Sequence, residues 1–359
     1  MGLVDAIKQT FTNSAIISSI TSVIFIIFLG FYLRKRGTLG ADFGKVLTKV
    51  VLAVALPALA FNSFMAPING DTLRQGMSVL VWGILIYIIL IFVTPLPYLK
   101  YKGDKRTTLS VLTIFGSTTF FGIPIVGAVL GPKGVMYSSI FNIGYRIFLY
   151  SYGYIRMSGL KMDRDNVKKM FLNPVVIATF LGLILWLVQD AMPHVTAAVA
   201  ANGAVVAGGG TASVAFYRID QTALWLFKPL QYLANLTSPL AWLAIGITLG
   251  SISFKEAASD STSWYYSLNK VILVPLLNLI LLLILNATGI MPVSYVALAT
   301  MCIMMATPTA AVTSAYAISF DHEAVMASDA SLLSTIVAVV AMPFWIAILQ
   351  ILNTTGLFK

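Results

Sequence analysis

Two long apolar stretches, each with an internal proline among small and hydroxylated residues, decide the fold. The first stretch, residues 107–131, reads TTLSVLTIFGSTTFFGIPIVGAVLG, and the second, residues 293–319, reads VSYVALATMCIMMATPTAAVTSAYAIS. Each is long enough to cross a bilayer, because about 20 apolar residues suffice for a spanning helix. Pro124 and Pro308 each remove a backbone donor and clash with the preceding turn, so we expect both helices to be broken mid-span.

The composition of the whole chain places these stretches in a membrane protein. Of its 359 residues, 58% are hydrophobic and 10% are charged, and the mean hydropathy is +0.90. Soluble proteins have about 45–50% apolar and about 25% charged residues. A soluble enzyme, a nucleic-acid-binding domain and a disordered protein are therefore excluded. One cysteine, Cys302, and two histidines exclude a disulfide framework and Cys/His metal clusters.

Apolar runs of spanning length recur along the chain and predict an all-α polytopic membrane protein with ten transmembrane helices. The runs are about twice as long as barrel strands and apolar on all sides, which favours helices over a β-barrel. The first run lacks the cleavage site of a signal peptide and is counted as a span. The ten runs lie near residues 14–33, 46–66, 76–98, 107–131, 134–157, 173–193, 229–253, 264–288, 293–319 and 323–351.

The basic residues predict the orientation of these spans. The loops after the odd-numbered spans, together with the span residues that flank them, hold 16 of the 23 Lys and Arg residues, and two of these, Lys255 and Lys270, follow the seventh span. Because cytoplasmic loops are enriched in Lys and Arg, we expect both termini to be extracytoplasmic in a multi-pass protein of the cell membrane. The net charge of +10 is then a topology signal, and no nucleic-acid partner is expected. Aromatic residues at the span edges are predicted to be interfacial anchors: Tyr98, Tyr101, Trp264, Tyr265 and Tyr266.

The ten spans divide into two halves of five. An odd number of spans gives the halves opposite orientations, so we expect inverted repeats over residues 1–165 and 166–359. Leu56-Pro57 and Ser238-Pro239 are related by an offset of 182, and Pro124 and Pro308 by an offset of 184. An insertion near 196–220, which includes Gly208–Gly210, interrupts the second half. It is interpreted as a lid, an interfacial segment or a flexible surface excursion.

Two broken helices at equivalent positions of inverted halves point to a transport site. The first turn of a half-helix leaves N–H donors unpaired and carries a partial positive charge, which suits a carboxylate. The alternative is a pair of ordinary proline kinks. The predicted substrate contacts here are Ser117, Thr118, Thr119, Gly122, Pro124, Thr307, Pro308 and Thr309.

Arg146 lies near the centre of the fifth predicted span, roughly 17 Å from each interface at 1.5 Å per residue. A central Arg costs about 2.5–3.5 kcal/mol even on the lenient insertion scale, so it needs a partner or a wet cavity. Its planar guanidinium can bind a carboxylate through two hydrogen bonds. Asn142, one turn earlier, is expected to share its face. The alternatives are a structural ion pair with Asp329 and a misplaced span boundary.

Asp329 lies about two turns into the last predicted span. Burial raises the pKa of a carboxylate in general, and a neighbouring cation lowers it. Asp329 is therefore a candidate for coupling or charge balance: it would carry a proton, help to hold a cation or neutralise Arg146. No nucleophile–base constellation and no pair of catalytic carboxylates is present, so no enzyme, cofactor or metal site is expected.

The chain resembles the auxin efflux carrier family of PIN-like and bacterial malate-permease-type carriers. The resemblance covers nearly the whole chain apart from the insertion, and it rests on the order and spacing of several motifs. These are LTKVVLAVALPALAFNSF at 47–64, GIP at 122–124, NPVVIA at 173–178 with Gly182, SPL at 238–240 with Gly246, ATPTA at 306–310, and LLST at 332–335 followed by Pro343.

This resemblance implies a particular architecture and mechanism. It implies two inverted five-helix repeats, crossed broken helices 4 and 9, and elevator-type alternating access. A scaffold domain would contain spans 1, 2, 6 and 7, and a transport domain spans 3–5 and 8–10. It also implies an organic-anion substrate, coupling to a proton or none, and a homodimer. The related bile-acid symporters couple to sodium.

The sequence departs from the family pattern at two residues. Ser117 stands where the family usually has Asn, and Arg146 is not expected in the plant carriers. A fixed cation favours a small, strongly anionic di- or hydroxycarboxylate such as malate over an auxin-like acid. The main alternative is a sodium-coupled symporter of a bulkier anion, like the bile-acid relatives, and span 9 lacks an acid that would favour it. A channel or a substrate-sensing receptor is a third hypothesis.

Overall fold

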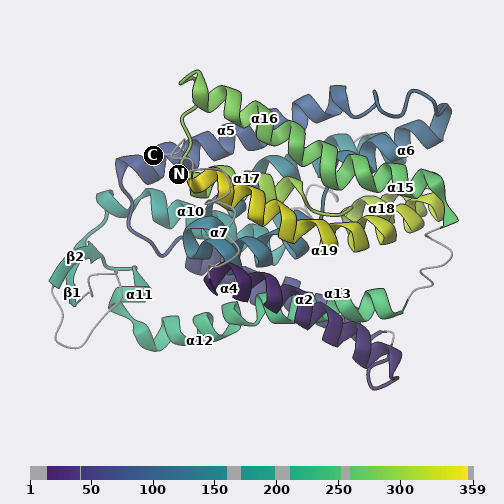
Figure 1. Cartoon of the computed structure of the whole chain (residues 1–359). Coiled ribbons are helices and arrows are strands. Elements are labelled where there is room, and N and C mark those ends of the chain that lie inside the picture. Colours follow the sequence, from purple (N-terminus) through teal and green to yellow (C-terminus); the bar gives the residue numbers. More distant parts are fainter. Residues whose placement is uncertain (1–13, 41, 160–170, 199–210, 252–258, 355–359) are drawn as a thin grey trace.

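The computed structural model describes residues 14–40, 42–159, 171–198, 211–251 and 259–354, which form a bundle made mainly of helices (Figure 1). Six helical stretches in this part of the chain are long and apolar enough to cross a membrane, and the helices Pro174–Leu187 and Tyr295–Met305 are apolar but shorter. The chain is therefore a polytopic helical membrane protein. The six stretches are Phe43–Ser63, Gly70–Val93, Thr118–Ser158, Leu224–Gly250, Ser261–Ala287 and Ala324–Thr354.

The bounds of the helices follow the predicted spans closely. The first half contains α2 (Ser14–Lys35), α3 (Phe43–Val50), α4 (Leu56–Ser63), α5 (Gly70–Val93), α6 (Gly103–Ile114), α7 (Ile123–Phe148) and α8 (Tyr154–Ser158). The second half contains α10 (Pro174–Leu187), α11 (Ile219–Thr222), α12 (Leu224–Asn235), α13 (Thr237–Gly250), α15 (Ser261–Leu268), α16 (Val274–Ala287), α17 (Tyr295–Met305), α18 (Ala311–Ser319) and α19 (Ala324–Thr354). Short π-helical turns join several of them, at Val51–Ala55, Thr118–Gly122, Leu149–Gly153 and Asn269–Leu273.

The longest stretch, Thr118–Ser158, contains a sharp break. Gly131 has φ 66° and ψ −161°, a conformation that an L side chain rarely adopts, and Pro132 follows it. The sequence placed a boundary between residues 131 and 134, and this break lies there.

The helices pack in two groups. In one group α13 packs on α2 and α3, while α4 packs on α10 and α12. Of these helices, α2, α4, α12 and α13 lie along the lower part of Figure 1. In the other group α5 and α17 pack on α7, and α15 and α18 pack on α19. The contact between α2 and α13 is close because it is made by glycines. A Cβ on Gly246 would collide with the carbonyl of Ile27, and one on Gly30 with the carbonyl of Leu243.

The region of the predicted insertion contains a small hairpin rather than an entirely irregular segment. Strands β1 (His194–Ala198) and β2 (Thr211–Ala215) pair antiparallel at one end of the bundle (Figure 1). The chain after β2 is held by a buried ion pair, in which Arg218 Nε lies 2.8 Å from Asp220 Oδ1. Gly208–Gly210 lie outside the described residues, and the role of the insertion stays a prediction.

Three residues predicted to be at a membrane surface are buried instead. Tyr98 and Tyr266 were predicted as interfacial anchors, but both are fully buried and hydrogen-bonded to threonines. Lys270 was counted among the two basic residues of a cytoplasmic loop, yet its side chain has no exposed surface. All three residues lie within a few positions of a predicted span end, so the sequence pattern placed them near the membrane surface and not in the interior.

Candidate functional site

Two unwound segments meet inside the bundle. Helix α6 ends at Ile114 and α17 ends at Met305, and the chain resumes helical form at Thr118 and Ala311. Between these ends, Gly116 and Thr309 form an antiparallel bridge. The Ser117 N–H donates to the Pro308 carbonyl at 2.7 Å, and the Ala310 N–H donates to the Phe115 carbonyl at 3.0 Å. We call residues 115–117 and 306–310 the crossover.

We expected the first break at Pro124, but it lies earlier in the chain, at residues 115–117. Pro124 closely follows the π-helical turn Thr118–Gly122 and lies inside the continuous helical stretch Thr118–Ser158, so it does not end the helix. Its carbonyl accepts a hydrogen bond of 2.9 Å from Ser238 Oγ of α13. Pro308, in contrast, lies in its unwound segment, as the sequence predicted.

Hydroxyl groups connect the crossover to the neighbouring helices. Tyr266 of α15 and Thr309 share a hydrogen bond of 2.6 Å between their hydroxyls. Thr309 Oγ1 lies 2.9 Å from Ser334 Oγ of α19. The Thr309 N–H also donates to Ser334 Oγ at 3.3 Å, so the segment is fixed from two sides.

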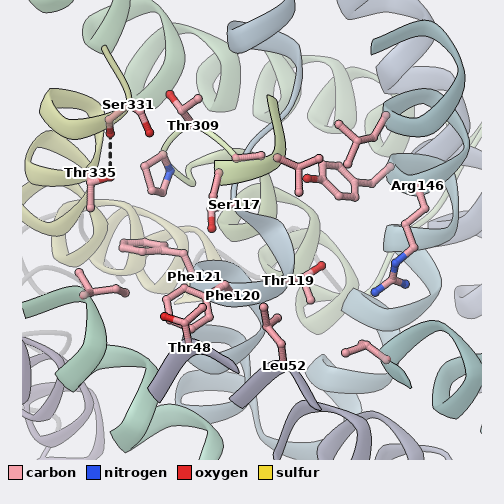
Figure 2. Close-up of a pocket in the computed structure, with 18 of the residues that line it drawn as sticks. Thr48, Leu52, Ser117, Thr119, Phe120, Phe121, Arg146, Thr309, Ser331 and Thr335 are labelled. Carbon is pink, nitrogen blue, oxygen red and sulfur yellow. Dashed lines mark hydrogen bonds between the residues drawn. The ribbon is translucent and has the colours of Figure 1, made fainter. Parts of the chain in front are cut away.

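A cavity of about 340 Å³ opens beside the crossover (Figure 2). Of the predicted contacts, Ser117, Thr119, Arg146, Pro308 and Thr309 line it. The cavity has other lining residues, most of which the sequence did not single out. These are Thr48, Leu52, Phe120, Phe121, Tyr145, Leu149, Tyr150, Asn173, Val175, Ile245, Thr248, Ala310, Ala311, Val312, Ser331 and Thr335. Their hydroxyl and aromatic groups come from both groups of helices.

Arg146 supplies the charge of this cavity. Its side chain extends from α7 in Figure 2. The residue is buried, with 8% of its surface exposed. Within the described part of the chain its guanidinium forms no hydrogen bond and no ion pair. No carboxylate is among the described residues that line the cavity. A guanidinium that borders an open space can bind an anion through two parallel charge-assisted hydrogen bonds.

Other predicted residues do not line the cavity. Thr118 and Asn142 are fully buried, and the Asn142 amide has no hydrogen-bond partner among the described residues. Thr307 donates to the Met304 carbonyl at 2.9 Å, and Gly122 packs against Met304. Asp329 is half-buried in α19 and is not among the lining residues.

A second cavity, of about 390 Å³, lies between α4, α7 and α12. Its lining includes Asn62, Ser63, Gly131, Gln231 and Asn235. The first cavity borders the starting residues of the stretch Phe43–Ser63, and the second borders its final residues. The two cavities therefore lie toward opposite ends of this stretch.

Comparison with known proteins finds relatives among membrane transporters. An uncharacterized transporter of Methanothermobacter thermautotrophicus is 24% identical over 341 residues, which cover 92% of this chain and 97% of that protein. An uncharacterized transporter of Methanocaldococcus jannaschii is 22% identical over 242 residues, covering 65% of this chain and 68% of that protein. Residues 15–346 match the family described as membrane transport protein. The chain belongs to this membrane transport protein family, the auxin efflux carrier and PIN-like family that its motifs resemble.

Proposed function

We propose that this membrane transporter is a secondary carrier of small organic anions and binds the substrate carboxylate in the cavity beside the crossover. The observation that carries the proposal is Arg146, a buried guanidinium that borders the cavity and has no described partner. Arg remains charged under nearly all conditions, so an anion that enters the cavity would gain its missing counter-charge.

The rest of the cavity favours a small hydroxylated or dicarboxylic acid such as malate. Ser117, Thr119 and Thr309 present hydroxyls from the crossover, and Ser331 and Thr335 present hydroxyls from α19. Hydroxyls both donate and accept hydrogen bonds, so they can bind carboxylate oxygens as well as substrate hydroxyls. Phe120, Phe121 and Tyr150 supply apolar and aromatic surface for the carbon skeleton.

The two cavities support an alternating-access carrier with inverted repeats. The offset of 182 relates Leu52 and Ile245 of the first cavity to Ala234 and Ser63 of the second. The offset of 184 relates Ala311 and Val312 of the first cavity to Gly127 and Ala128 of the second. Equivalent residues of the two halves thus surround opposite cavities, as expected when one half repeats the other upside down.

The packing groups suggest which helices move. The group with α2, α4, α10 and α13 would form the scaffold, and the group with α5, α7, α17 and α19 would carry the crossover as a transport domain. The cavity residues Thr48 and Thr248 come from the first group, and Arg146 comes from the second. An elevator-type movement of the second group would expose the anion to each cavity in turn, and a homodimer would anchor the scaffold.

Counterflow in proteoliposomes tests the proposal directly. The panel would contain malate, lactate, succinate, citrate and indole acetate, each with and without sodium and a pH gradient. We expect saturable exchange of a small acid, and Arg146→Gln should reduce it at least tenfold. Arg74→Gln, at an arginine whose side chain is 61% exposed, is the matched control and should transport normally. Unchanged exchange by Arg146→Gln would remove the guanidinium from the site, and sodium-dependent uptake of a bulkier anion would favour the bile-acid-like alternative.

A further inference from the structure

Lys270 is a second buried cation, and the anion site does not use it. It lies in the π-helical turn Asn269–Leu273, within the apolar stretch Ser261–Ala287. None of its side-chain surface is exposed. An ammonium in such a place is costly unless a negative or partly negative group compensates it.

The compensating group is the end of a half-helix. Lys270 Nζ donates to the Thr113 carbonyl at 3.0 Å, and Thr113 is the penultimate residue of α6. The last carbonyls of a helix lack intrahelical partners and carry partial negative charge. Lys270 therefore binds the carbonyl end of the helix that leads into the crossover.

The ammonium also lies directly against the crossover. A Cβ on Gly116 would be 3.0 Å from Lys270 Nζ and would collide with Thr307 Oγ1. Thr307 in turn donates to Met304 near the end of α17, the other half-helix. Lys270 is thus placed beside the point where the ends of α6 and α17 converge.

No described carboxylate replaces the helix end as a partner. Helices α6, α15, α16 and α19 pack against the turn of Lys270. Their described charged residues, together with the N-cap Asp260, are Asp104, Lys105, Arg106, Asp260 and Asp329. Asp104 pairs with His322, and none of these acids forms an ion pair with Lys270.

We propose that the Lys270 ammonium is a built-in cation that stabilises the converging carbonyl ends at the crossover. A free metal cation is then not needed at this place, so anion transport proceeds without sodium. This inference rests on the proposed anion-carrier function for its transport consequence. Its consequence for the folded protein is independent of any substrate.

Cation rescue separates this role from simple packing. Lys270→Ala leaves a space beside Thr113, whereas Lys270→Met fills it with an uncharged chain of similar length. We expect both variants to melt at lower temperature than the wild type in choline chloride. Ethylammonium chloride should raise the melting temperature of Lys270→Ala toward the wild-type value, and it should leave Lys270→Met unchanged. Lys45→Ala, at a lysine whose side chain is 80% exposed, is the control that ethylammonium should not affect.

Transport provides the second readout. Wild-type counterflow should be equal in sodium and choline media. Lys270→Ala should lose at least tenfold in rate and recover part of it with ethylammonium. Wild-type stability and transport in Lys270→Met, absence of rescue in Lys270→Ala, or a wild-type requirement for sodium would each overturn the inference. If the wild type moves no anion at all, the proposed function fails, and the melting temperatures still decide the role of Lys270.

Discussion

Gly116 is the residue where the two unwound segments leave no space for a side chain. A Cβ there would collide with Thr307 Oγ1 and lie 3.0 Å from Lys270 Nζ. Both neighbours are fully buried and hydrogen-bonded, so neither can withdraw without losing a contact. We expect Gly116→Ala to lower the free energy of unfolding by about 1–3 kcal/mol, the usual cost of overpacking.

An SDS titration in mixed micelles would measure this change. Gly70→Ala is a suitable control, because a Cβ at Gly70 meets nothing within 4 Å. Counterflow should also fall in Gly116→Ala, since the bridge between Gly116 and Thr309 shapes one wall of the cavity. Equal stability and transport in the two variants would mean that the crossover relaxes easily.

Single residues differ in how far the sequence could identify them. Arg146 was identified because its distance from both span ends leaves no route to water, and the structure places it at the cavity. Asn142 shares the helix but is buried away from the cavity, because one turn along α7 already faces neighbouring helices. Tyr266 and Lys270 lie close to the start of the predicted span 264–288, so the sequence pattern placed both at the membrane surface. The packing of α15 against α19 places Tyr266 and the following turn, Asn269–Leu273, in the interior of the bundle.

At the scale of elements, helix α15 begins with a well-formed cap. Asp260 accepts hydrogen bonds from the backbone N–H groups of Thr262 and Ser263 and from the Ser263 hydroxyl. Partial burial raises the pKa of Asp260, but these hydrogen bonds outweigh burial and leave its pKa below the ordinary value. The ionised carboxylate is therefore the form that stabilises the helix.

This cap predicts a pH-dependent stability difference. A lowered pKa in the folded state adds stability above the unfolded pKa of about 3.9, and this stability is lost as the pH falls through the folded value. We expect Asp260→Ala to cost about 1 kcal/mol at pH 7. The difference from the wild type should shrink below about pH 4. Asp42→Ala is the control, because Asp42 precedes α3 without capping it through its side chain. A cost that stays constant from pH 7 to pH 3 would contradict the assignment.

The half-helices illustrate what sequence patterns can and cannot predict about elements. Apolar length and prolines predicted two interrupted spans at the right places along the chain. The predicted position of the first interruption was wrong by several residues: the break occurs at Phe115–Ser117, and Pro124 lies inside the helical stretch Thr118–Ser158. A proline indicates that a helix is interrupted nearby, but the contacts of the neighbouring residues decide on which side of the proline the chain unwinds. Here Ser117 unwinds to pair with Pro308, a partner almost 200 residues away that no local pattern reveals.

For the whole molecule, the relation between the two cavities is the main argument for transport. The stretches Phe43–Ser63 and Leu224–Gly250 each border the first cavity toward one end and the second cavity toward the other. Arg146 lines only the first cavity, so the two cavities are not equivalent in this conformation. A carrier that alternates between them must make one accessible while it closes the other.

Cysteine accessibility tests this alternation in the intact protein. The chain has one native cysteine, Cys302, which is fully buried and gives a silent background. Thr248→Cys would report on the first cavity and Gln231→Cys on the second. If both termini are extracytoplasmic, as the basic residues predict, an impermeant maleimide should label Gln231→Cys in right-side-out vesicles and Thr248→Cys in inside-out vesicles.

The decisive result is the response of the two positions to a transported anion. A ligand shifts an equilibrium only by its different affinities for the two states, so a rise in labelling at one cavity must accompany a fall at the other. Arg146→Gln should abolish this reciprocal change while it leaves basal labelling intact, because the guanidinium acts on the anion and not on the access route. If both positions react from the same side, the two cavities belong to one face of the membrane, and the inverted-repeat interpretation fails. If both change in the same direction, the anion opens or closes the protein as a whole, which is the behaviour of a channel and not of a carrier.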